Sequence, residues 1–128
     1  MEKYDPTIAP DPVEWLELDE QERVDMAVTY HEAAKIKLPN VTLHAVVHVV
    51  VENQIAEGLQ STVRAMERLV VKDRLSRHDA LHAIGSVVSE HMVAAMKTTD
   101  SNYASTAQAR YDTAVDRLTA KKWKRLYG

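Results

Sequence analysis

Two apolar stretches of this chain each carry a pair of histidines four residues apart, His44 with His48 and His78 with His82. Side chains four positions apart lie on the same face of an α-helix, one turn from each other. The first stretch also places Glu52 one turn beyond His48. Because most of the remaining positions are apolar, the pattern predicts two buried helices whose polar groups need a partner, either each other or a metal ion.

Signals for helix starts and ends recur along the chain and predict an all-α fold. Polar residues precede the apolar-periodic segments as N-caps, Pro12 suits a first helical position, and Gly58 suits a helix end. Residues 1–10 are punctuated by prolines and predict a flexible N-terminal tail. Residues 11–128 predict one single-domain antiparallel helical bundle of five to six helices. The expected helices span residues 12–18, 20–36, 41–57, 62–72, 77–97 and 103–125.

Length, charge and composition limit the classes of protein that fit. A chain of 128 residues suits one domain with one core, and the absence of cysteine excludes disulfides and thiolate chemistry. The net charge of -3 argues against a nucleic-acid partner. No apolar run approaches the roughly 20 residues of a membrane span, and no signal peptide is visible. We therefore expect a cytoplasmic protein without a membrane partner; its other partners stay open, and a homo-oligomer is one option.

The histidine pairs predict a metal site. Imidazole and carboxylate groups are common helix-borne ligands of first-row metals, and pairs on two facing helices make a four-ligand site. We predict that the ligands are His44, His48, His78 and His82, and that Glu52 is a fifth ligand or a group that holds one of the rings. Without thiolates, the ion would be Zn, Fe, Ni, Mn or Cu(II), and its identity stays open.

Other interpretations of the same residues remain. The histidines could instead form a metal-free buried polar network in a structural or interaction module, or a cluster that responds to pH. No reaction can be assigned: the segment that starts at His31 resembles the zincin motif but has Lys35 where the second histidine belongs. The roles of His31 and His91 stay open.

Gly85 lies inside the predicted helix of residues 77–97. A glycine there costs about 1 kcal/mol relative to alanine, so it needs a reason. We predict that it allows two helices to approach closely; the alternative is that it admits a ligand.

One stretch also resembles a known group of proteins. The motif Leu43-His44-x-x-x-His48, followed by Gln54-x-Ala56 and by His78-x-Ala80-x-His82-Ala83-Ile84-Gly85, is similar to that of a bacterial family of small uncharacterised proteins that share a domain of unknown function. The resemblance covers about residues 38–97. It implies a soluble bacterial helical protein in which the four paired histidines act as a set, and it implies no activity.

Overall fold

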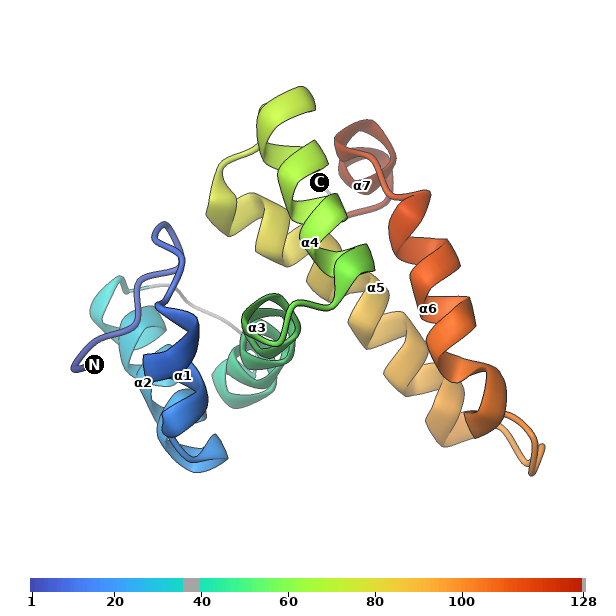
Figure 1. Cartoon of the computed structure of the whole chain (residues 1–128), viewed down its shortest axis with the longest axis horizontal. Helices are drawn as coiled ribbons and strands as arrows, with labels where there is room; N and C mark the ends of the chain where they lie inside the picture. Colours follow the sequence, from blue (N-terminus) through green and yellow to red (C-terminus); the bar gives the residue numbers. More distant parts are fainter. Residues whose placement is uncertain (36–39, 128) are drawn as a thin grey trace.

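The computed structural model describes residues 1–35 and 40–127. This part of the chain contains seven α-helices and no strand, which confirms the all-α prediction. Seen along the axis of α3, the first two helices lie on one side of it and the last four on the other (Figure 1). None of the described helices has both the length and the apolar character that crossing a membrane requires. The helices are α1 (Pro12–Glu17), α2 (Glu20–Ala33), α3 (Val41–Ala56), α4 (Gln60–Glu67), α5 (Arg77–Lys97), α6 (Ala107–Asp116) and α7 (Ala120–Tyr127).

Most predicted helix boundaries are correct because local capping determines them. Side chains at four N-cap positions accept hydrogen bonds from backbone N–H groups of the first turn, as expected. Gly58 has a φ of 75°, the left-handed conformation that lets the chain leave α3. The predicted break at residues 38 and 39 lies outside the described residues. The four caps are Asp11, Asp19, Asn40 and Ser76.

The predicted start of a helix at residue 62 makes Ser61 its expected N-cap, and this prediction is wrong. Helix α4 begins at Gln60, with Leu59 at its N-cap, so Ser61 lies within the first turn. Its hydroxyl donates instead to Asp112 of α6 over 2.7 Å. The side chain does not cap the helix because it binds a partner 51 residues away in the sequence. The segment that follows α4, Arg68–Lys72, is a π-helical turn rather than a continuation of the α-helix.

The predicted single helix of residues 103–125 is divided, which raises the helix number from the expected five or six to seven. A short 3-10 turn (Ala104–Thr106) precedes α6, and α6 ends before α7 begins. The guanidinium of Arg68 donates to the carbonyl oxygens of Val115 and Leu118 and so satisfies the end of α6. Asp73 accepts from the backbone N–H of Ala120 at the start of α7. Both partners come from the π-helical turn and the residue after it, so the break depends on tertiary contacts.

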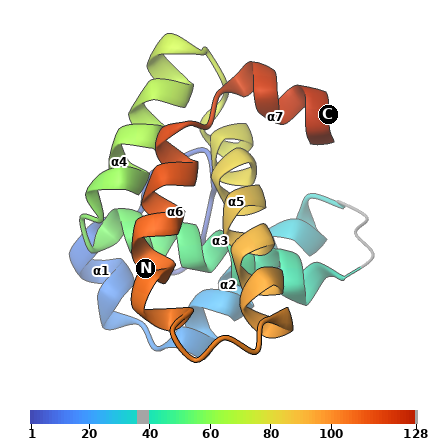
Figure 2. The same ribbon diagram turned by 90° about the vertical axis from the view of Figure 1, so that its right-hand side faces the viewer.

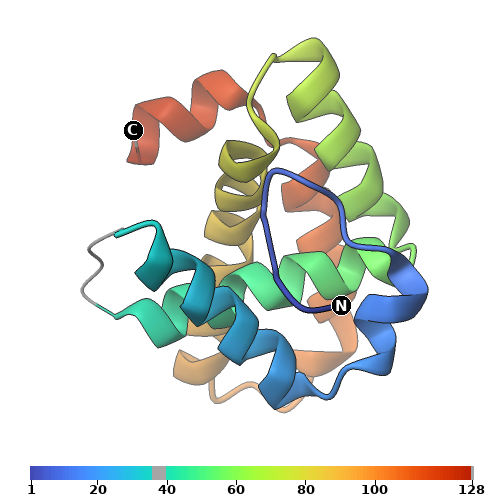
Figure 3. The same cartoon turned by 90° about the vertical axis from the view of Figure 1, so that its left-hand side faces the viewer.

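Helix α3 separates two apolar clusters. One cluster packs α3 against the N-terminal segment, α1 and α2, and the larger one packs it against α4 to α7. The N-terminal segment contains no helix, as expected, but it lies across the bundle (Figure 3) and Tyr4 is only 3% exposed. Our expectation of a tail missed this contact, because the partner of Tyr4 is far away in the sequence.

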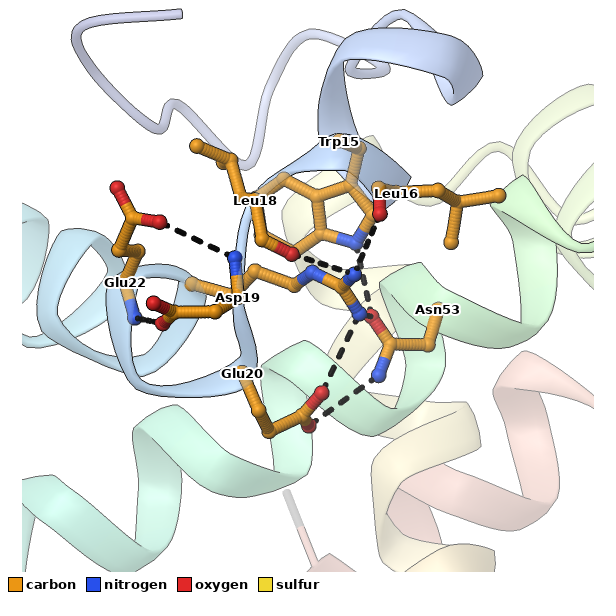
Figure 4. Close-up of polar contacts among 8 residues, drawn as sticks. Trp15, Leu16, Leu18, Asp19, Glu20, Glu22 and Asn53 are labelled. Carbon is orange, nitrogen blue, oxygen red and sulfur yellow. Dashed lines mark hydrogen bonds and ion pairs between the residues drawn. The ribbon is translucent and has the colours of Figure 1, made fainter.

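The guanidinium of Arg23 joins α1, α2 and α3. Its partners Leu16, Leu18 and Asn53 are labelled in Figure 4. It donates to the carbonyl oxygens of Leu16 and Leu18 over 3.0 and 2.8 Å, which satisfies the end of α1. It also donates to the side-chain oxygen of Asn53 on α3 over 3.0 Å, and the same oxygen accepts from the indole N–H of Trp15 over 2.9 Å. These contacts fix α2, which carries His31, on α3, which carries His44 and His48.

The close approach of α3 and α5 depends on Gly85. A Cβ atom added there would lie 2.7 Å from Cγ1 of Val47, which is shorter than real carbon contacts. The structure thus supports the packing interpretation of this glycine.

We expect Gly85→Ala to lower the free energy of unfolding by about 1–2 kcal/mol, because overpacking costs more than the roughly 1 kcal/mol gained in helix propensity. Urea unfolding measures this change. In a Val47→Ala background the clash is absent, so the same substitution should be neutral or stabilising there. Equal losses in both backgrounds would contradict the contact as the cause.

Candidate metal centre

Five histidines from three helices converge on one place in the bundle. We call them the histidine cluster: His31 of α2, His44 and His48 of α3, and His78 and His82 of α5. The distances between neighbouring ring centroids run from 4.4 Å, for His78 with His82, to 5.9 Å, for His31 with His78. The structure therefore brings the two sequence-predicted pairs together and adds a fifth ring that the prediction left without a role.

Four of these rings form a group that could hold a metal ion. His31, His48, His78 and His82 each offer one ring nitrogen, and these four atoms lie within 4.8 Å of one another. Zn–N bonds of about 2.0–2.1 Å imply N···N distances of about 3.3 Å in a tetrahedral site, so the rings would close in by about 1.5 Å around an ion.

His31 presents a lone pair to the cluster. Its Nδ1 lies 2.7 Å from the carbonyl oxygen of Ala27, and a carbonyl only accepts, so Nδ1 carries the hydrogen. The Nε2 atom therefore carries the lone pair. The residue is fully buried, and Nε2 has no hydrogen-bond partner among the described residues. The same is true of the buried Nε2 of His78. A buried polar atom without a partner costs about 1–3 kcal/mol, and both of these nitrogens belong to rings of the histidine cluster.

The tautomer of His48 follows from Tyr4. The tyrosine hydroxyl has one hydrogen, and it donates this to Oε2 of Glu52 over 2.6 Å. Its oxygen then accepts from Nδ1 of His48 over 3.1 Å. Burial, followed by the nearby Glu52 carboxylate, raises the pKa of Tyr4, so the hydroxyl keeps its hydrogen. Nε2 of His48 therefore carries the lone pair that a metal ligand needs.

Glu52 lies outside the four-histidine group. Arg77 donates to both of its carboxylate oxygens, over 2.6 and 2.9 Å. The hydroxyl of Tyr4 donates to one of them as well. The carboxylate is 1% exposed and its charge is balanced by the guanidinium. Its connection to the cluster runs through Tyr4 to His48, an arrangement that orients a ligand ring. Its predicted role as a fifth ligand stays a prediction.

His82 lies within hydrogen-bond distance of two other rings of the cluster. Nε2 of His82 lies 3.1 Å from Nε2 of His44 and 3.1 Å from Nε2 of His48. A neutral ring nitrogen has either one hydrogen or one lone pair, so His82 can satisfy only one of these two contacts fully. The geometry places His44 beside the group, where it borders the cavity described below.

Burial lowers the pKa of four rings of the cluster and keeps them neutral. Burial, and then the neighbouring histidines, lower the pKa of His44 to about 4, that of His48 to about 2 and that of His82 to about 3. The pKa of His78 is also lowered, by burial first and then by His31. Neutral imidazole is the form that binds metals, so these rings are in the binding form at neutral pH.

His31 had a signal in the sequence that we did not use. It follows Val24, Ala27 and Val28 at helical spacing, on the stripe of α2 that faces the core. A histidine on an apolar stripe of an otherwise polar helix needs a buried partner, just as the two pairs do. His91, by contrast, lies two turns beyond His82 on α5 and packs against Tyr111, away from the cluster.

Comparisons with protein-family models, curated proteins and solved structures found no match to this chain. The resemblance of residues 38–97 to a bacterial family of uncharacterised proteins therefore stays a prediction.

The lowered pKa values predict a loss of stability in acid. At pH values above 6.5 the ring of His48 is neutral in both the folded and the unfolded state and contributes nothing. Below pH 6.5 His48 binds a proton in the unfolded state but not in the folded state, so the free energy of unfolding falls as the pH falls. We expect the metal-free protein to lose about 2 kcal/mol between about pH 6.5 and about pH 5 from His48 alone, measured by urea unfolding. His48→Gln should reduce that dependence; a wild-type stability that is unchanged over this interval would contradict it.

Proposed function

We propose that this protein binds one divalent transition-metal ion through His31, His48, His78 and His82. The observation that carries the proposal is the convergence of four ring nitrogens within 4.8 Å, in a group where His31 and His78 each have a buried Nε2 with no partner among the described residues. Three helices supply the ligands, so a bound ion would tie α2, α3 and α5 together. Hydrogen bonds from Nδ1 of His31 to the backbone and from Nδ1 of His48 to Tyr4 orient two of the rings for this role.

The ligand set favours some ions over others. All four groups are imidazoles, which suit Zn, Ni, Fe and Cu(II), whereas Mn prefers carboxylate oxygens. The carboxylate that the sequence predicted as a ligand, that of Glu52, accepts hydrogen bonds from Arg77 and Tyr4 instead. We therefore place Mn last among the ions that the sequence left open. Glu52 contributes by orienting His48 through Tyr4.

A metal-free polar network is the second candidate. The two Nε2–Nε2 distances of 3.1 Å around His82 are normal hydrogen-bond lengths and favour it. It leaves the Nε2 atoms of His31 and His78 unexplained, because neither has a partner in the described residues. A metal ion would bind both of these nitrogens, so they favour the metal site over the network.

Equilibrium dialysis tests the proposal. Protein stripped with a chelator is dialysed against Zn²⁺ and Ni²⁺, and the bound metal is measured by elemental analysis. We expect one ion per chain in the wild type and in His91→Ala, a matched control because His91 lies outside the cluster. We expect none in His31→Gln and His78→Gln, which keep much of the side-chain volume. Folding of each variant is checked by circular dichroism. Wild-type protein that binds no metal, or variants that bind as much as the wild type, would overturn the proposal.

A further inference from the structure

A cavity of about 480 Å³ opens beside the histidine cluster. We call it the side cavity. Residues of α3, α5 and α7 line it, and we call the part of its wall that His44, His48 and His82 form its inner end. In Figure 2, α7 extends past the first turns of α5 on the same side as the start of α3. The side cavity therefore gives a small molecule access to the ring nitrogens from outside the bundle.

The charge of a loaded metal centre would be unbalanced. The four ligands of the proposed site are neutral imidazoles, so a divalent ion keeps its full charge of +2. The nearby Glu52 cannot offset it, because Arg77 already balances that carboxylate. Asp5 and Asp79, whose charges act on His78, are exposed, so solvent screens them. No Asp, Glu, Lys or Arg is among the described residues that line the side cavity. A partly buried cation with no anionic ligand attracts an anion strongly, and the side cavity is where that anion can reach it.

The walls of the side cavity are mostly apolar. Leu43 and Val47 of α3, Leu81 of α5 and Trp123 of α7 line it, with the small Gly85 between the helices. The hydroxyls of Ser86 and Ser89 are among the few polar groups. Apolar walls around a small number of polar groups are typical of sites for small organic molecules. The side cavity thus combines an apolar volume with a proposed cation at its inner end.

We infer that the side cavity binds a small monocarboxylate with an apolar body, whose carboxylate completes the coordination of the metal ion. This inference rests on the proposed metal site. The hydrocarbon or aromatic part of the ligand lies between Leu81 and Trp123, and the carboxylate reaches the ion beside His48 and His82. His44 lies at the junction of cavity and cluster, where its ring can donate a hydrogen bond to the second carboxylate oxygen in its Nε2–H tautomer.

Co²⁺-loaded protein and benzoate test this inference. Visible absorption of Co²⁺ reports directly on ligands that join the ion. The part of the tryptophan fluorescence that is lost in Trp123→Ala, and so does not come from Trp15, reports on the cavity wall. We expect benzoate to change both signals and to bind roughly tenfold more tightly than acetate, which lacks the apolar body. Benzyl alcohol, which has the apolar body without the charge, should bind at least roughly tenfold more weakly than benzoate.

A matched pair of variants separates the cavity from the metal. Trp123→Ala removes a wall of the side cavity and should weaken benzoate binding about five- to tenfold without changing the Co²⁺ content. Leu126→Ala removes an apolar side chain from the same helix that does not line this cavity, and it should bind benzoate like the wild type.

The outcomes distinguish this inference from the proposed function. Protein that holds Co²⁺ but shows no benzoate-dependent change in its visible absorption overturns the inference and leaves the metal site standing. Equal binding of benzoate, acetate and benzyl alcohol overturns it as well, and so does a Trp123→Ala variant that binds benzoate like the wild type. Protein that takes up no Co²⁺ or other transition metal overturns both.

Discussion

Replacing Arg77 with methionine is expected to lower the free energy of unfolding by about 3–5 kcal/mol, because it leaves the Glu52 carboxylate buried without a compensating charge. Glu52 is 1% exposed, and Arg77 donates to both of its oxygens. The same guanidinium holds the N-terminal segment through the carbonyl oxygen of Pro6, over 2.9 Å. Urea unfolding of the metal-free protein measures the loss.

The matched control is Arg64→Met. Arg64 makes an ion pair of 3.2 Å with Asp116, and both side chains are about half exposed. Exposed pairs of this kind contribute about 0–1 kcal/mol, so the control should lose little. Adding Glu52→Gln to Arg77→Met removes the uncompensated charge and should recover part of the stability. Similar losses for Arg77→Met and Arg64→Met would contradict the importance of burial for the first pair.

Metal loading is expected to give the second large effect. A ligand that binds only the folded state, present at about 100 times its dissociation constant, adds about 2.7 kcal/mol to the free energy of unfolding. Because the proposed ligands come from α2, α3 and α5, this gain requires the packed bundle. The measurement is urea unfolding of the chelator-treated protein with and without Zn²⁺.

His31→Gln should abolish this stabilisation by Zn²⁺, and His91→Ala should retain it. Both variants lose one histidine, so the comparison corrects for weak binding of zinc to histidines of the unfolded chain. Stabilisation that persists in His31→Gln would place the ion away from the four-histidine group. The absence of any shift in the wild type would favour the metal-free network.

The fold was predictable where the signals are local. Asn40 and Gly58 frame α3, and Ser76 begins α5, because capping side chains and a left-handed glycine act within a few residues of their own position. The division of residues 103–125 was not predictable, because the groups that end α6 and begin α7 are Arg68 and Asp73, more than 40 positions away in the sequence.

The part of the candidate site that depends on local spacing was also predictable. A spacing of four within one helix correctly placed His44 with His48 and His78 with His82, and the need of buried rings for partners correctly suggested that the pairs meet. That spacing provides no information on His31, which has no second histidine on its own helix.

The position of Tyr4 was not predictable, because nothing within the N-terminal segment indicates that its hydroxyl lies between His48 and Glu52. Long-range contacts, rather than local patterns, decide which rings face one another and where Glu52 points.

Anomalous scattering from crystals of the Zn²⁺-loaded protein, measured at the zinc absorption edge, tests the central claim most directly. The account predicts one peak within about 2.0–2.1 Å of a ring nitrogen from each of His31, His48, His78 and His82. It also predicts that Glu52 remains paired with Arg77. A peak at exposed carboxylates, or no peak at the histidine cluster, would contradict it.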